Sequence, residues 1–171
     1  MWADAESVPL PVLTSALPAT MSALGGSLTL VGTGFLKLRR FVLGTMVCDV
    51  TVTDDENAVA TVPVQSVESA RVYLDTRGGQ AANHPLITFT PDLVSLAPAS
   101  TSAAGGAAIV LTGAGFSNVT DVKVDGISVV FVVNSNTQIT ITTAAHAAGV
   151  VSVEVIAPAG SDTLAASLTF A

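Results

Sequence analysis

The sequence predicts an all-β protein built from two tandem sandwich domains. Three observations support this fold class: the chain repeats itself at a nearly constant offset, its composition favours strands, and turn signals recur every 8–12 residues or so. Of its 171 residues, 50% are hydrophobic but only 11% are charged and 5% aromatic. Val and Thr suit pleated strands, and Gly and Pro separate the short apolar runs.

The repeat is clearest in one short phrase. TLVGTGF begins at Thr29 and VLTGAGF begins at Val110, so that Gly32 corresponds to Gly113 at an offset of 81 residues. Alternating glycines suit a strand end that bends, because one of them can adopt a positive φ.

The correspondence continues along both halves of the chain. Residues 69–79 correspond to residues 150–160 at the offset of 81, and residues 58–63 are predicted to correspond to residues 138–143 at an offset of 80. These segments alternate apolar and polar residues, which predicts strands with one buried face.

The repeat sets the expected domain boundaries. We expect an extended N-terminal arm at residues 1–12, a first domain at residues 13–90 and a second domain at residues 91–171. No linker separates Thr90 from Pro91, so little flexing between the domains is expected.

The second copy also carries motifs of a known family. It contains, in order, the pair Gly105-Gly106, TGAGF, VKVDGISVV, NSNTQITIT, HAAGVVSVEVIAPAG and a closing LTF. This order resembles the IPT/TIG family of immunoglobulin-like domains. The first copy keeps the glycine pair and GTGF but departs from the family between Leu36 and Glu56. The resemblance implies an immunoglobulin-like β-sandwich for each copy and implies no chemistry, because such sandwiches serve many functions.

Several apolar side chains are expected in the interior. Phe35 and Phe116 follow the glycine phrases, and Phe89 and Phe170 lie in the closing strand of each copy. Burial of these large rings would anchor the two cores. Cys48 is the lone cysteine and is expected to be a buried structural thiol.

The sequence offers no catalytic constellation. A hydrolytic triad needs a placed nucleophile and an orienting acid, and neither His84 nor His146 lies in a motif that supplies them. His146 is interpreted as a surface turn residue. The acidic run at residues 53–57 lacks the spacing and glycine of a calcium loop and is expected to be solvated. We therefore expect no enzyme activity, no metal and no cofactor.

Charge and hydropathy limit the partners. A net charge of −7 argues against nucleic acid, which needs clustered cations. The cluster of Lys37, Arg39 and Arg40 suits a local docking patch. No apolar run approaches the roughly 18 residues of a membrane-spanning helix; SVVFVVNS, for example, is too short. The low charge indicates either a neutral surface or one packed against other subunits.

The N-terminal arm is a further candidate for partner binding. It contains Trp2, Val8 and Leu10, and Pro9 and Pro11 would hold it extended. We expect it to dock the protein onto its partner. The alternative is that it folds back on its own domain as an added edge strand.

Two functional interpretations follow. The first is a structural or accessory protein of a bacteriophage virion, made in the host cytoplasm, which decorates a capsid or tail by binding other virion subunits, with self-association left open. The start MWADAESVPLPVL lacks the basic and apolar regions of a signal peptide, which favours this interpretation. The alternative is a bacterial cell-surface or secreted module that binds carbohydrate or protein.

Overall fold

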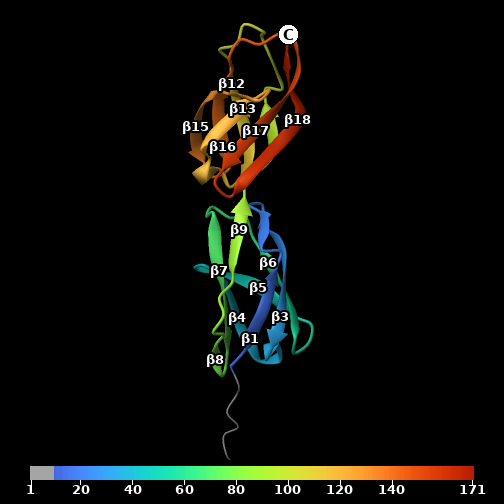
Figure 1. Ribbon diagram of the computed structural model, residues 1–171, viewed down its shortest axis with the longest axis vertical. Coiled ribbons are helices and arrows are strands. Elements are labelled where there is room, and N and C mark those ends of the chain that lie inside the picture. Colours follow the sequence, from blue (N-terminus) through green and yellow to red (C-terminus); the bar gives the residue numbers. More distant parts are fainter. Residues whose placement is uncertain (1–9) are drawn as a thin grey trace, which may run out of the picture. The chain divides into compact units, whose positions relative to one another are not determined.

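The structure is a computed structural model that describes residues 10–171, and these residues form strands joined by turns and two short 3-10 helices (Figure 1). The predicted all-β, immunoglobulin-like sandwich architecture is confirmed. Contacts divide the described chain into two compact units. The first contains residues 10–21, 25–63 and 69–88, and the second contains residues 22–24, 64–68 and 89–171.

Nine strands lie in the first copy, drawn blue to green in Figure 1. They are β1 (Val12–Leu17), β2 (Thr20–Ser22), β3 (Gly26–Thr33), β4 (Leu38–Leu43), β5 (Met46–Val52), β6 (Asn57–Val62), β7 (Ser69–Thr76), β8 (Gly79–Gln80) and β9 (Leu86–Thr90). They form one hydrogen-bonded path, β1-β3-β6-β5-β4-β7-β9-β2, with β8 paired to β7. The path is continuous because β5 pairs with β4 through its first half and with β6 through its second half.

The second copy, drawn yellow-green to red, keeps its two layers separate. Its strands are β10 (Asp92–Ala97), β11 (Ser100–Thr101), β12 (Ala108–Ala114), β13 (Asp121–Val124), β14 (Ile127–Ser128), β15 (Val130–Ser135), β16 (Gln138–Thr142), β17 (Gly149–Ala157) and β18 (Gly160–Phe170). One sheet has four strands in the order β10-β12-β16-β15, and the other has five in the order β11-β18-β17-β13-β14. Apolar side chains from both sheets form the core.

The repeated glycine phrase ends a strand in each copy. Gly34 (φ 82°) and Gly115 (φ 76°) adopt the left-handed conformation that begins a short 3-10 helix. This turn carries Phe35 and Phe116 into the interior, where both rings are fully buried. The glycine is needed because L side chains rarely adopt this backbone conformation.

The first strand begins earlier than predicted. Val12, which was assigned to the N-terminal arm, lies in β1 and pairs with Thr33. A Cβ atom at Gly32 would overlap the Val12 carbonyl oxygen, so close strand approach requires glycine there. In the second copy, Gly113 meets the Asp92 carbonyl oxygen in the same way.

One predicted correspondence is wrong by a single residue. Ala58 was aligned with Gln138, but Ala58 pairs with Leu30 and Ile139 pairs with Leu111. Leu30 corresponds to Leu111 at the offset of 81, so Ala58 corresponds to Ile139. The difference matters because a one-residue slip moves every side chain of a strand to its other face.

The other side chains that the sequence predicted to be in the core are also buried. Phe89 and Phe170 are buried, as is Cys48. Burial raises the pKa of the Cys48 thiol above its ordinary value, because desolvation disfavours the thiolate.

Candidate interaction surface

The outward face of the four-stranded sheet is built from uncharged rows. Strand register aligns its exposed and half-buried side chains across the strands, whereas Ile109, Leu111, Ile139 and Ile141 point into the core. The rows are Ala108, Thr142 and Val130; Ala97, Val110, Thr140 and Val132; and Ser95, Thr112, Gln138 and Ser135. Among the described residues of these strands, the charged one is Asp92, at the beginning of β10.

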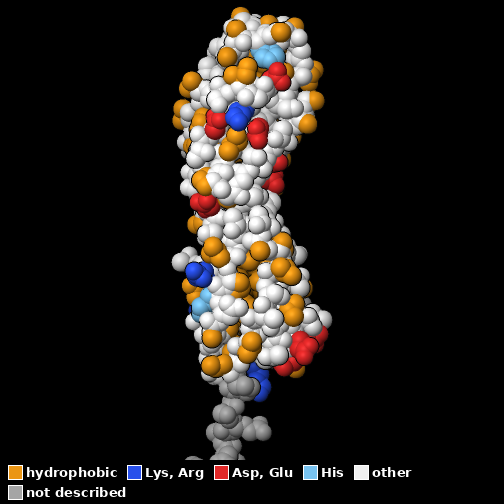
Figure 2. Space-filling model, in the orientation of Figure 1, with side chains coloured by type: hydrophobic (Ala, Val, Ile, Leu, Met, Phe, Trp, Pro, Cys, Tyr) orange, Lys and Arg blue, Asp and Glu red, His pale blue; other side chains and the backbone are white. Residues whose placement is uncertain are grey.

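Strand β15 forms the free end of this sheet. It is last in the strand order, and it exposes Val130 to 75%, Val132 to 61% and Val133 to 36%. Phe131, between them, packs against the core. Hydrophobic side chains reach the surface of this unit in Figure 2. A row of exposed valines on an edge strand is unusual for a solvated surface.

The charges of the second copy lie elsewhere. They are carried by the five-stranded sheet and its hairpin turn, at Asp121, Lys123, Asp125, Glu154 and Asp162. The two sheets of this sandwich therefore differ in chemistry: one carries several charged side chains, and the other carries Asp92 at the beginning of β10.

The first copy places charge where the second has valine. Asp49 pairs with Thr61, and Val130 pairs with Thr142 at the same register. Both positions are related by the offset of 81, and both side chains are exposed. Asp49 and Val130 are therefore structural equivalents on the same edge.

The turn beyond this edge differs in the same way. The Gly32 amide donates to the carbonyl of Glu56 (2.8 Å), and the Gly113 amide donates to the carbonyl of Thr137 (3.1 Å). The acidic residues 54–56 thus correspond to residues 135–137, which are Ser, Asn and Thr. Figure 2 shows the acidic side chains gathered at one side of the first unit.

The acidic turn binds its own backbone. Asp54 accepts hydrogen bonds from the amides of Glu56 and Asn57, each at 2.8 Å, and Asp55 accepts one from Gly34 at 3.3 Å. The Glu56 amide, followed by the Asn57 side chain, lowers the pKa of Asp54. The loop is exposed, as expected, and its carboxylates organise the turn. Within residues 10–171, no three His, Cys, Asp or Glu side chains are grouped to hold a metal.

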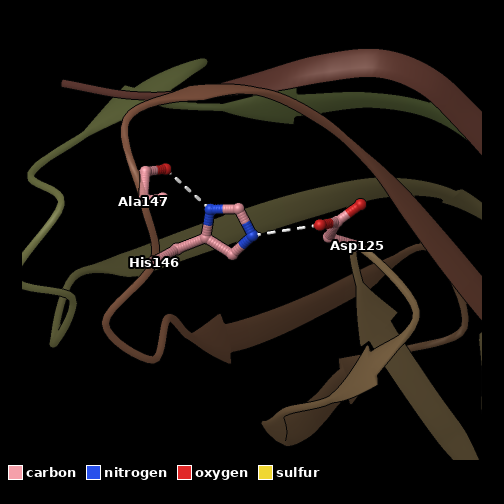
Figure 3. Close-up of polar contacts among 3 residues, drawn as sticks. All are labelled: Asp125, His146 and Ala147. Atoms are coloured by element: carbon pink, nitrogen blue, oxygen red, sulfur yellow. Dashed lines mark hydrogen bonds and ion pairs between the residues drawn. The ribbon is translucent and has the colours of Figure 1, made fainter.

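His146 is more than the surface turn residue that the sequence indicated (Figure 3). Its Nδ1 lies 2.7 Å from the carbonyl oxygen of Ala147, and its Nε2 lies 3.1 Å from Oδ2 of Asp125. Both partners are acceptors, so the protonated ring donates to both. These contacts, the Ala147 carbonyl first, raise the pKa of His146. The ring also packs 4.8 Å from the Phe170 ring. The cluster ties the loop to the β13–β14 hairpin.

His84 also has a packing role. Its ring lies 4.5 Å from the Tyr73 ring, and its Nδ1 lies 3.2 Å from the Val72 carbonyl oxygen. The Arg71 guanidinium donates to the His84 carbonyl (3.0 Å). These contacts include no serine, threonine or cysteine nucleophile.

The predicted partner-binding residues are only partly brought together. Trp2 and Val8 lie outside the described residues, and Leu10 is exposed. Lys37 and Arg39 line a shallow hollow that also includes Arg77. Arg40 is exposed but lines a different hollow, with Tyr73 and Asp75 among its neighbours.

Sequence reasoning missed the surface formed by β15. The signal was present in SVVFVVNS, which was judged only as a membrane segment and not as an exposed edge. None of the helices in the described part of the chain is long and apolar enough to cross a membrane.

Comparison with known proteins places the second copy in a family. The model of the IPT/TIG domain matches residues 91–171. Residues 91–171 form an IPT/TIG domain. The resemblance predicted for the second copy is confirmed. For residues 13–90, membership of the IPT/TIG family rests on the internal repeat and stays a proposal. No curated protein matches the chain.

Among the solved structures compared, a surface glycan-binding protein shares the fold at low sequence identity, and two others align with TM-scores below 0.5. PbSGBP-B of Prevotella bryantii, a surface glycan-binding protein, is 17% identical with a TM-score of 0.51, over 91% of this chain and 41% of that protein. The plexin A4 extracellular region is 19% identical with a TM-score of 0.45, over 100% of this chain and 19% of that one. The Yersinia pseudotuberculosis adhesin InvE is 16% identical with a TM-score of 0.42, over 94% of this chain and 58% of that one. This chain thus spans less than two thirds of each.

Proposed function

We propose that this chain is a non-enzymatic binding segment of a bacterial surface protein and that its ligand is another protein. The immunoglobulin-like fold, shared with a Prevotella surface glycan-binding protein, supports the bacterial-surface interpretation that the sequence analysis held second. The virion interpretation, which the sequence analysis put first, has no support among the comparisons.

The uncharged face of the IPT/TIG domain is the observation that carries this proposal. Its rows consist of Ala, Val, Ser, Thr and Gln side chains across β10, β12, β16 and β15. Charged residues are depleted at the centres of protein interfaces, whereas solvated surfaces normally carry charges of both signs. A face of this composition fits an uncharged, flat surface on a partner protein.

The chemistry of the exposed side chains favours protein over glycan. Within residues 10–171, the large hydrophobic side chains that are exposed are all aliphatic, so no aromatic platform is offered to a sugar ring. Tyr73 is half-buried and packs on His84.

We also propose that the protein has no enzyme activity. His146 is held by Asp125 and Ala147, and His84 by Tyr73 and Val72. A general base must reach the proton that it abstracts. In this protein both rings are instead used in packing contacts.

Site-specific crosslinking in the producing bacterium tests the proposal. A photoreactive amino acid replaces Thr112, which is exposed on the uncharged face, or Thr163, which is exposed on β18 of the charged sheet. We expect one defined protein adduct from position 112 on intact cells and none from position 163. Equal adducts from both positions, or labelling found in phage particles but not on cells, would reject the proposal.

A further inference from the structure

We propose that β15 joins two copies of this chain edge to edge, by antiparallel pairing with β15 of a second copy. The two four-stranded sheets would then form one continuous sheet. This self-association does not depend on the partner protein proposed above.

The first argument is that β15 lacks the usual protection of an edge. Natural edge strands are blunted by charges, Pro, bulges or short length. β15 has six residues and no charge. Its one irregularity falls between Val133 and Ser135, next to the turn, and leaves residues 130–133 regularly paired with β16.

The second argument is that the other edges of the second copy are protected. β10 begins at Asp92 and is followed by Pro98. β11 and β14 are two residues long each. The equivalent edge of the first copy carries Asp49 and the acidic residues 54–56. Among the described residues, β18 is paired on its outer side only at Thr169 and Phe170, and the rest of that edge carries Asp162. β15 is thus the long edge of the second copy that carries no charge.

The third argument is that the strand that pairs with β15 is β15 of a second copy. A two-fold axis at Val132 places Val132 opposite Val132, Phe131 opposite Val133 and Val130 opposite Asn134. This register keeps outward side chains on one continuous face, as strand pairing requires. Apolar pairs directly opposite one another stabilise antiparallel strands, and like charges there destabilise them. The central residues 131–133 are therefore complementary to themselves, and no charge lies opposite another charge.

Charge supports the same occupant. Two chains of net charge −7 repel one another, and this repulsion is smallest where the contact itself brings no like charges close together. Apart from Asp92 at the beginning of β10, the charged residues of the second copy lie on the five-stranded sheet and its turn. Pairing through β15 therefore brings two copies together on the sheet that carries the fewest charges.

The area involved sets the strength of the pairing. A strand of six residues spans roughly 20 Å. Its pairing with one other strand buries less than the roughly 1,600 Å² of a standard interface. We therefore expect a monomer–dimer equilibrium that depends on protein concentration, not a permanent dimer.

Sedimentation of the purified chain tests the pairing. Val132→Asp places two like charges directly opposite one another on the two-fold axis, and Thr112→Asp adds the same charge to the same face away from the edge. We expect the wild type to dimerise, Val132→Asp to weaken the dimer by about tenfold or more, and Thr112→Asp to match the wild type. Melting curves check that each variant is folded.

Two outcomes would overturn the proposal. A wild type that stays monomeric at its highest soluble concentration shows that the edge does not pair. Equal weakening by the two variants shows that the copies associate through the face of the sheet. Loss of the crosslinked partner at position 112 with normal dimerisation would reject the proposed function alone.

Disulfide trapping tests the register. Val132→Cys would bring two thiols across the two-fold axis, close to the separation that a disulfide needs. We expect covalent dimers under mild oxidation. Thr163→Cys and the wild type, whose Cys48 is buried, should give none. Equal crosslinking of Val132→Cys and Thr163→Cys would contradict the register.

Discussion

Strand β15 and the second half of β5 occupy the same position in two copies of one fold, yet they present opposite surfaces. Each pairs with the equivalent inner strand in the same register, through Thr142 and Thr61. Val130 stands in one copy where Asp49 stands in the other. The turns that follow are uncharged in one copy and acidic in the other, at residues 135–137 and 54–56.

The difference shows how a repeated scaffold separates stability from interaction. The core positions, Phe35 and Phe116 among them, are the same in both copies because the sandwich needs them buried. The edge has no such constraint. Charge there keeps an edge monomeric, and its removal leaves backbone groups open to another strand.

The largest expected effect comes from removing the core ring that the two copies share. Phe35→Ala and Phe116→Ala each remove a fully buried ring. We expect each to cost about 3–5 kcal/mol of unfolding free energy, because a cavity replaces the lost packing. Urea unfolding followed by circular dichroism measures the loss. A cost below about 1 kcal/mol for either variant would show that the two cores are not equivalent.

Exchanging the edge residues sharpens the comparison. In the double variant Asp49→Val/Val130→Asp, the apolar residue moves from the second copy to the first. We expect self-association weaker than in the wild type, because β15 gains a charge and the edge of the first copy keeps the acidic residues 54–56 in the turn that follows β5. Sedimentation velocity measures the dimer fraction. Association as strong as that of the wild type would show that edge charge does not control pairing.

A smaller effect concerns His146, which only the second copy has. Its contacts with Ala147 and Asp125 raise its pKa in the folded state above the ordinary value of 6.5. The stability that they contribute is therefore fully present below pH 6.5 and is lost as pH rises through the folded-state pKa. We expect NMR titration to give a pKa above 6.5 that falls in Asp125→Asn. A pKa that is unchanged in Asp125→Asn would contradict the assignment.

The smallest expected effect concerns Asp54 in the acidic turn. The Glu56 and Asn57 contacts lower its pKa below the ordinary value of 3.8. Its contribution to stability is present above pH 3.8 and is lost as pH falls through the folded-state pKa. We expect Asp54→Ala to lower the melting temperature at pH 7 and to have less effect in strong acid. A melting temperature unchanged at pH 7 would show that the turn does not depend on this carboxylate.

Much of the fold could be predicted from local patterns. Alternation in residues 138–142 and 149–157 predicted strands β16 and β17. The pair Asp125-Gly126 in VKVDGISVV is a hairpin signal, and both residues have positive φ in the turn between β13 and β14. These signals are short-range and survive in a single sequence.

The errors arose where local patterns do not determine register. The alignment at Ala58 slipped by one residue, because a strand of alternating small residues fits nearly as well one position along. Val12 was assigned to the arm, because its pairing with Thr33 is a long-range contact. The continuity of β5 between both layers could not be read from its own residues.

The candidate surface was missed for a related reason. Exposure of Val130 and Val132 follows from the place of β15 at the end of a sheet, which depends on the pairing of distant strands. Lys37 and Arg39, predicted from one short run, meet Arg77 only through the fold. The sequence pointed to the basic residues, but it did not show which of them lie together in the folded protein.

Hydrogen exchange tests the contrast between the two edges most directly, because one chain contains both. Amide exchange is measured by NMR in dilute and in concentrated wild-type protein. We expect residues 130–133 of β15 to become more protected in the concentrated sample, and residues 49–52 of β5 to exchange equally in both. Equal exchange of β15 in the two samples, or added protection of β5, would contradict the account.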